Sequence, residues 1–187
     1  MVSKSRSRTL KLVLTAVFVA LFTVGAYVKI PVSVITVSLQ FLFVLLSFLL
    51  LGARLSFVAV LIYLIMGLVG LPVFVSGGGY AYVFNLSFGY LVGFLVATLV
   101  GGSLARRKVS FGGYLLSSLI AMVIVHACGI AYMLLLKDYL YAGGNDLTLS
   151  YVLIYATLPL LPTDVIWCVL ASFIATKLRP IIVKYNV

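Results

Sequence analysis

The sequence contains no glutamate and few charged residues of either sign. Among its 187 residues the only acids are three aspartates, and charged residues make up 9% of the chain. A soluble domain carries about 25% charged residues, so this scarcity excludes a soluble globular domain. The chain also has only two cysteines, which excludes a disulfide-rich scaffold.

Motifs that carry catalysis or metal binding are also missing. The sequence has no phosphate-binding GxxxxGK[ST] loop, no HExxH and no GxSxG. We therefore expect no ATP hydrolysis and no other enzyme activity in this chain. Cys128 and Cys168 lie in apolar segments, without a CxxC or a histidine partner at metal-ligand spacing. They are predicted to be buried free thiols, with no metal site and no cofactor.

Apolar residues are abundant and define the class of protein. They make up 65% of the chain, whose mean hydropathy is +1.32. A transmembrane helix takes about 20 such residues, so the length accommodates about six helices. We therefore predict an all-α integral membrane protein in which residues 1–187 form a single bundle of six transmembrane helices. The predicted segments are 10–27, 39–53, 55–71, 85–104, 114–136 and 149–178, the last interrupted by Pro159 and Pro162.

The basic residues indicate the orientation in the membrane. The net charge of +10 would suit nucleic acid, but the lysines and arginines lie in short clusters between the apolar segments. Six helices place both termini on one side. The termini and the loops on that side contain 11 basic residues, against only Lys29 and Lys137 on the other side. The positive-inside rule then predicts cytoplasmic termini in a cell membrane, with lipid rather than nucleic acid as the surroundings. The outer loops, 28–38, 72–84 and 137–148, are the longer ones and predict a site that opens outward.

Three polar residues lie where the membrane makes them costly. Asp164 is the only acid within a predicted helix, and it lies about 20 Å along that helix from Lys177, in the outer half of the membrane. A carboxylate there is unfavourable unless it pairs, lines a hydrated cavity or binds a ligand. Gln40 and Asn85 begin helices on the same side. We expect all three to converge on one small-molecule cavity, the alternative being a structural pair of Asp164 with Asn85 or Lys29.

A glycine run and several aromatic residues are candidates for the walls of this cavity. Gly77, Gly78 and Gly79 let the backbone turn freely and approach a ligand closely. Tyr82 and Tyr90 follow this run and either wall the cavity or belong to an aromatic belt at the membrane interface. Trp167, on the same helical face as Asp164, is either a cavity wall or a packing residue.

Other features concern the shape and packing of the helices. Pro162 is predicted to kink the last helix and to free carbonyl groups near Asp164. His126, the single histidine, has no acid near it in the sequence and is expected to pack or to form a hydrogen bond. Ala16 and Ala20 lie on one face of the first helix and predict a close helix contact, either within the bundle or with a partner protein.

Four stretches that follow one another along nearly the whole chain resemble a known family. They are AVFVALFTVGAYVKIPV, ITVSLQFLFVLLSFLLLGARLSFVAVLIYLIMGLVGLPVF, the glycine run with FGYLVGF, and LPTDVIWCVLASFIATKLRP. With them the sequence resembles the BioY proteins, the biotin-binding S-components of energy-coupling factor vitamin transporters. It departs from the family pattern at Leu86 and Ser87, where Pro-Thr is frequent, and at Trp167, where lysine is frequent.

The resemblance implies a six-helix bundle that captures biotin from the outside as a transported substrate. Delivery would require a transmembrane coupling subunit and two ATPase subunits. Asp164 and Asn85 would bind the ureido ring, which presents two N–H donors and one carbonyl acceptor. The other implied roles are ring contacts from Tyr82, Tyr90 and Trp167, carboxylate contacts from Gln40, Lys29 or the amides around Gly78, and docking of the coupling subunit on Ala16 and Ala20.

Three other functions stay open at this point. An S-component for a different vitamin would keep the fold and change only the pocket. A small membrane enzyme would need more polar groups inside the bundle than Asp164 and His126. A channel would need polar residues through to the cytoplasmic side, where the predicted helices are almost wholly apolar.

Overall fold

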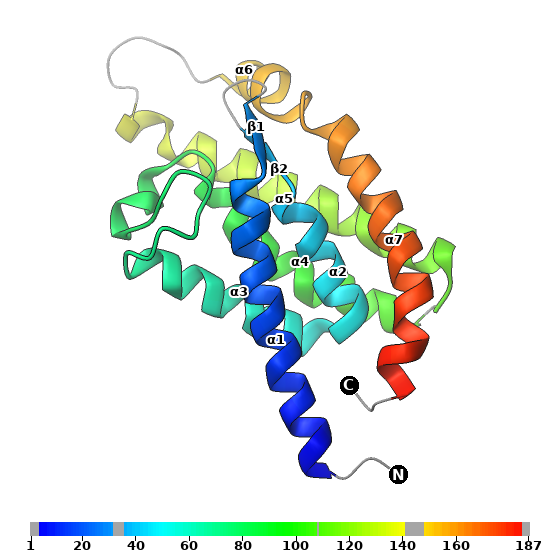
Figure 1. Cartoon of the computed structure of the whole chain (residues 1–187). Helices are drawn as coiled ribbons and strands as arrows, with labels where there is room; N and C mark the ends of the chain where they lie inside the picture. Colours follow the sequence, from blue (N-terminus) through cyan, green and yellow to red (C-terminus); the bar gives the residue numbers. More distant parts are fainter. Residues whose placement is uncertain (1–3, 32–35, 108, 141–147, 185–187) are drawn as a thin grey trace.

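The computed structural model describes residues 4–31, 36–107, 109–140 and 148–184, most of them in helices (Figure 1). A short antiparallel sheet, in which Lys29 pairs with Ser38, connects the first two helices. The elements are α1 (Lys4–Tyr27), β1 (Lys29–Pro31), β2 (Thr36–Ser38), α2 (Gln40–Leu51), α3 (Ala53–Leu68), the 3-10 helix η1 (Tyr80–Phe84), α4 (Phe88–Arg107), α5 (Phe111–Leu140), α6 (Leu149–Tyr151), the π-helix η2 (Val152–Thr157) and α7 (Leu161–Lys184).

Within the described part of the chain, four helices are long and apolar enough to cross a membrane. They are Arg8–Tyr27 of α1, Phe88–Arg107 of α4, Phe111–Lys137 of α5 and Leu161–Ile182 of α7. The apolar helices α2 and α3 are shorter, with 12 and 16 residues. They are joined at Gly52, whose φ of 82° favours glycine, so the predicted tight turn between the second and third apolar segments is confirmed. The third segment ends as a helix at Leu68 and not at residue 71.

Helix α2 forms the centre of the bundle. Of its 12 residues, 11 are buried, and α1, α3, α4 and α7 pack around it. A helix that is apolar on every side can be buried on every side. The apolar sequence of α2 therefore explains its central position. Because Gln40 is the first residue of this helix, its side chain is buried at one end of the bundle.

Small residues set the distance between helices in two different ways. On α4, a Cβ at Gly89 would lie 2.2 Å from Cβ of Tyr132, and one at Gly93 would lie 2.9 Å from Cα of Val125. These glycines let α4 and α5 approach closely inside the bundle. Ala16 and Ala20 of α1 are exposed instead, so they make no such contact within the described chain.

The last predicted segment, 149–178, is not one helix. The structure divides it into α6 with η2, which ends at Thr157, and α7, which begins at Leu161. Pro162 lies in the first turn of α7, where a residue without an N–H costs no helical hydrogen bond. The N–H of Asp164 donates to the carbonyl of Leu160 at 3.0 Å. The predicted kink at Pro162 is therefore wrong, because this proline starts a helix and does not interrupt one.

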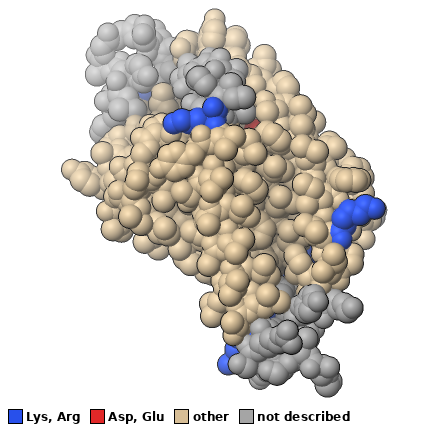
Figure 2. Space-filling view, viewed as in Figure 1, with Lys and Arg blue, Asp and Glu red and all other residues tan. Residues whose placement is uncertain are grey.

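Helix α1 begins and α7 ends at the same end of the molecule (Figure 1). The sequences of both helices carry basic residues there. A Cβ at Gly52 would lie 2.6 Å from the guanidinium of Arg106, so the α2–α3 turn and the end of α4 meet there. Nη1 of Arg179 donates to the carbonyl of Leu49 at 2.7 Å. Figure 2 shows the broad uncharged surface that separates the few basic side chains visible in this view, which suits contact with lipid.

Candidate functional site

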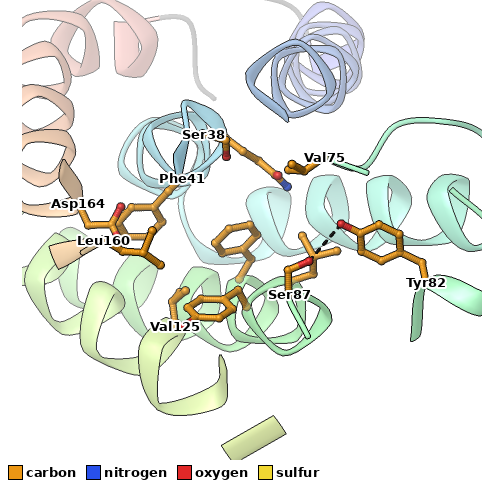
Figure 3. Close-up of a pocket in the computed structure, with 12 residues that line it drawn as sticks. Ser38, Phe41, Val75, Tyr82, Ser87, Val125, Leu160 and Asp164 are labelled. Carbon is orange, nitrogen blue, oxygen red and sulfur yellow. Dashed lines mark hydrogen bonds between the residues drawn. The ribbon is translucent and has the colours of Figure 1, made fainter. Parts of the chain in front are cut away.

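A recess at the opposite end of the bundle is the candidate site. Its empty volume, counted together with the open solvent in its mouth, is about 560 Å³. Helices α2, α4 and α7 all begin beside it (Figure 3). The residues that line it are Ser38, Gln40, Phe41, Val75, Tyr82, Ser87, Tyr90, Leu91, Phe94, Val125, Leu160 and Asp164.

Aromatic rings form much of the wall. Phe41 of α2 and Phe94 of α4 stack with centroids 6.1 Å apart and planes at 17°. Tyr82 packs on Phe74 with centroids 4.5 Å apart. The ring of Tyr90, itself only 8% exposed, completes this side. Flat, rigid side chains of this kind suit a ring-shaped ligand.

Asp164 projects from the first turn of α7, and His126 of α5 is its partner. Nε2 of His126 lies 3.3 Å from Oδ2 of Asp164. The alternative expectation, a pair with Asn85 or Lys29, is wrong. His126, which has no acid near it in the sequence, has Asp164 near it in space. The recess adjoins the same carboxyl group, so Asp164 has both a partner and an open space beside it.

Two further polar groups of the recess are buried without a well-aligned hydrogen bond. Among the described residues, neither Nε2 of Gln40 nor the hydroxyl of Tyr90 forms a hydrogen bond of good geometry, although Tyr63 is a polar neighbour of Gln40 and Thr157 is one of Tyr90. Gln40 is only 2% exposed, and leaving such a group unpaired costs about 1–3 kcal/mol. A polar ligand in the recess would satisfy both groups.

Asn85 does not line the recess but holds a residue that does. Its Oδ1 accepts from the N–H of Ser87 at 2.9 Å and from Oγ of Ser87 at 2.7 Å. Oγ of Ser87 also lies 3.2 Å from the hydroxyl of Tyr82. Ser87 and Tyr82 line the recess, whereas Asn85 does not. Sequence reasoning missed Ser87, since a serine beside an asparagine gives no signal of its own.

The other predicted residues lie around the recess. Nζ of Lys29 donates to the carbonyl of Val75, a lining residue, and Lys29 pairs with Ser38 in the sheet. Lys29 is therefore at the mouth. Trp167 packs against the core, and Gly78 is held against the carbonyl of Leu71, where a Cβ would lie 2.0 Å away. Neither Trp167 nor Gly78 lines the recess.

Together, the long apolar helices define a multi-pass membrane protein, with a recess lined by aromatic and polar side chains at one end. The model of the BioY family matches residues 1–184. The chain therefore belongs to the BioY family.

Individual relatives agree with this assignment. A protein named probable biotin transporter BioY from Lysinibacillus sphaericus is 43% identical over 127 residues, which cover 67% of this chain and 65% of that protein. The biotin transporter BioY of Thermotoga maritima is 33% identical over 93% of this chain and 98% of its own length. A crystal structure of the S-component for biotin from an ECF-type ABC transporter shares the fold, with a TM-score of 0.82 at 22% identity over 96% of this chain and 95% of that one.

Proposed function

We propose that this protein is the substrate-capture subunit of a biotin uptake transporter. It binds biotin from outside the cell in the recess and carries out no chemistry itself. The names of its relatives support biotin as the substrate, and the shared fold supports the role of an S-component. The observation that carries the proposal is a largely buried acid, Asp164, in an aromatic recess that also holds polar groups of Gln40 and Tyr90 without well-aligned hydrogen bonds.

The ureido ring of biotin is the complement of these groups. It presents two N–H donors and one carbonyl acceptor. The carboxylate of Asp164 accepts an N–H, and the hydroxyl of Tyr90 donates to the carbonyl. Phe41 and Phe94 pack against the fused rings. Asn85 contributes indirectly by holding Ser87.

The acid tail of biotin points to the other side of the recess. In Figure 3, Val75 and Tyr82 lie across the recess from Asp164. Lys29, which contacts the carbonyl of Val75, is then at the tail end together with the amide of Gln40. Gly78 and Trp167 shape the surroundings and do not touch the ligand.

We also infer that residues 1–187 form one domain whose six helices cross the cell membrane, with both termini cytoplasmic. The common end of α1 and α7 and the basic residues there support this orientation. A transmembrane coupling subunit and two ATPase subunits supply the energy. Ala16 and Ala20, exposed on α1, form the surface that docks the coupling subunit.

Titration calorimetry with biotin tests the proposal. Asp164→Ala is expected to weaken binding about tenfold to a hundredfold, because it removes a charge-assisted hydrogen bond worth about 1.5–3 kcal/mol. Asn85→Ala should have a smaller effect, exerted through Ser87. Thr176→Val, in the inner half of α7, is the matched control, since its hydroxyl bonds only to the carbonyl of Ser172 in the described structure. Unchanged affinity in Asp164→Ala would refute the assignment, and a thermal-shift panel of vitamins would show whether a different one binds.

A further inference from the structure

His126 lies directly behind the surface of the recess and contacts two residues that line it. It is 6% exposed and follows Val125, a lining residue of α5. Its Nε2 lies 3.3 Å from Oδ2 of Asp164. Its ring meets that of Tyr90 edge-on, with centroids 5.8 Å apart and planes at 83°. His126 therefore contacts both the acid of the recess and one of its tyrosines.

Packing alone does not account for an imidazole at this position. Neither ring nitrogen has a hydrogen-bond partner among the described residues, and a buried polar ring without partners is unfavourable. In the described part of the chain, the one acidic group within ion-pair distance is Asp164. Nε2 and Oδ2 are already within hydrogen-bond distance, and only the angle between the two groups falls short.

We propose that His126 is a positioning residue for the biotin-binding carboxylate, an inference that rests on the proposed function. Its Nε2–H donates to Oδ2 of Asp164 and fixes the orientation of the carboxyl group. The other oxygen, Oδ1, is then left to accept an N–H of the ureido ring. The same imidazole supports the ring of Tyr90. The recess is thereby set to recognise a group that presents N–H donors beside a carbonyl.

The chain allows this arrangement to be observed directly, because His126 is its only histidine. Protein labelled with ¹⁵N-histidine and purified through a tag without histidines gives imidazole signals from this residue alone. We expect the signals of a ring protonated at Nε2, a change on addition of biotin, and loss of that change in Asp164→Asn. A ring protonated at Nδ1, or signals that do not respond to biotin, would overturn the proposal.

Affinity measurements give a second, independent test. His126→Phe should weaken biotin binding about tenfold, and His126→Gln, which keeps a donor, should recover most of that loss. In an Asp164→Asn background His126→Phe should cost less than about twofold, because the two residues act as a unit. Equal costs in both backgrounds, or no rescue by glutamine, would show a structural role only. Met133→Leu, a similarly buried change on α5, controls for repacking.

The outcomes also separate this inference from the proposed function. If the unmodified protein fails to bind biotin, the proposed function itself is wrong. If it binds biotin and the histidine variants bind equally well, only the role of His126 is wrong.

Discussion

Gly129 of α5 leaves the space that the ring of Tyr90 occupies. A Cβ on residue 129 would lie 2.5 Å from Cε2 and Cζ of Tyr90. The tyrosine ring therefore lies on bare backbone and forms part of the wall of the recess. The width of the recess therefore depends on residue 129 being a glycine, since a larger residue there would displace the ring of Tyr90.

Gly129→Ala is expected to push the ring of Tyr90 toward the ligand. Overpacking of this kind costs about 1–3 kcal/mol, so biotin affinity should fall about fivefold to a hundredfold. Gly112→Ala on the same helix is the control, since nothing lies within 4 Å of a Cβ there. Calorimetry on the two variants measures the difference. Wild-type affinity in Gly129→Ala would mean that Tyr90 is not a wall of the occupied site.

Gln40 should show opposite effects on stability and on binding. Its Nε2 is buried and forms no hydrogen bond of good geometry in the empty protein, and an unsatisfied buried group costs about 1–3 kcal/mol. Gln40→Met, similar in shape, should therefore raise the Tm of the empty protein by a few degrees and weaken biotin binding. Thermal unfolding with and without biotin measures both effects.

Ser47→Ala provides the comparison for Gln40→Met. Ser47 is equally buried in α2, but its hydroxyl donates to the carbonyl of Val44 at 2.7 Å. Its removal should leave affinity unchanged and should not raise Tm. A Gln40→Met protein that is less stable and binds biotin normally would show that the amide serves the fold.

Lys29 should distinguish the acid from the amide form of the ligand. The side chain is exposed, and an exposed ion pair contributes only about 0.2–1 kcal/mol. Lys29→Ala should therefore weaken biotin binding about twofold to fivefold and leave the binding of biotin amide unchanged. Lys137→Ala, which alters another exposed basic residue, should change neither. An equal loss for both ligands would place Lys29 in a structural role.

The sequence predicted the helical membrane class and part of the recess. A polar side chain within an apolar membrane helix is unfavourable unless it pairs or binds a ligand, and this rule identified Asp164 and Gln40 as candidates. The structure places both in the lining, together with Tyr82 and Tyr90. The membrane class followed from the high content of apolar residues alone.

The remaining contacts depend on how the helices are rotated, which the sequence does not encode locally. Helix α5 is apolar around its whole circumference, so no periodic face shows which residues meet α7. The contact of His126 with Asp164 joins these two helices and could not be predicted from spacing. Asn85 was expected to face the ligand, yet the local backbone directs it to Ser87. The predicted kink at Pro162 is wrong because the sequence does not show that η2 ends at Thr157 and that a new helix begins at Leu161.

The exposed alanines of α1 should matter for transport and not for binding. Ala16 and Ala20 are both exposed, while Phe18 and Phe22 of the same helix face the core. A larger side chain at either alanine therefore meets no atoms of the recess. Ala16→Trp and Ala20→Trp should leave biotin affinity within about twofold, because surface changes usually alter stability by less than about 0.5 kcal/mol. Biotin uptake by cells that also express the coupling module should be abolished, because a close helix contact tolerates no bulk.

The matched control is Val123→Trp, which introduces the same large side chain on α5 at a residue that is 62% exposed. It adds bulk to the surface without touching α1, so uptake and binding should both be retained. Uptake by radiolabelled biotin and affinity by calorimetry are measured on the same three variants. Loss of binding in the alanine variants would show that this face packs within the bundle, and normal uptake in them would move the docking surface to another helix.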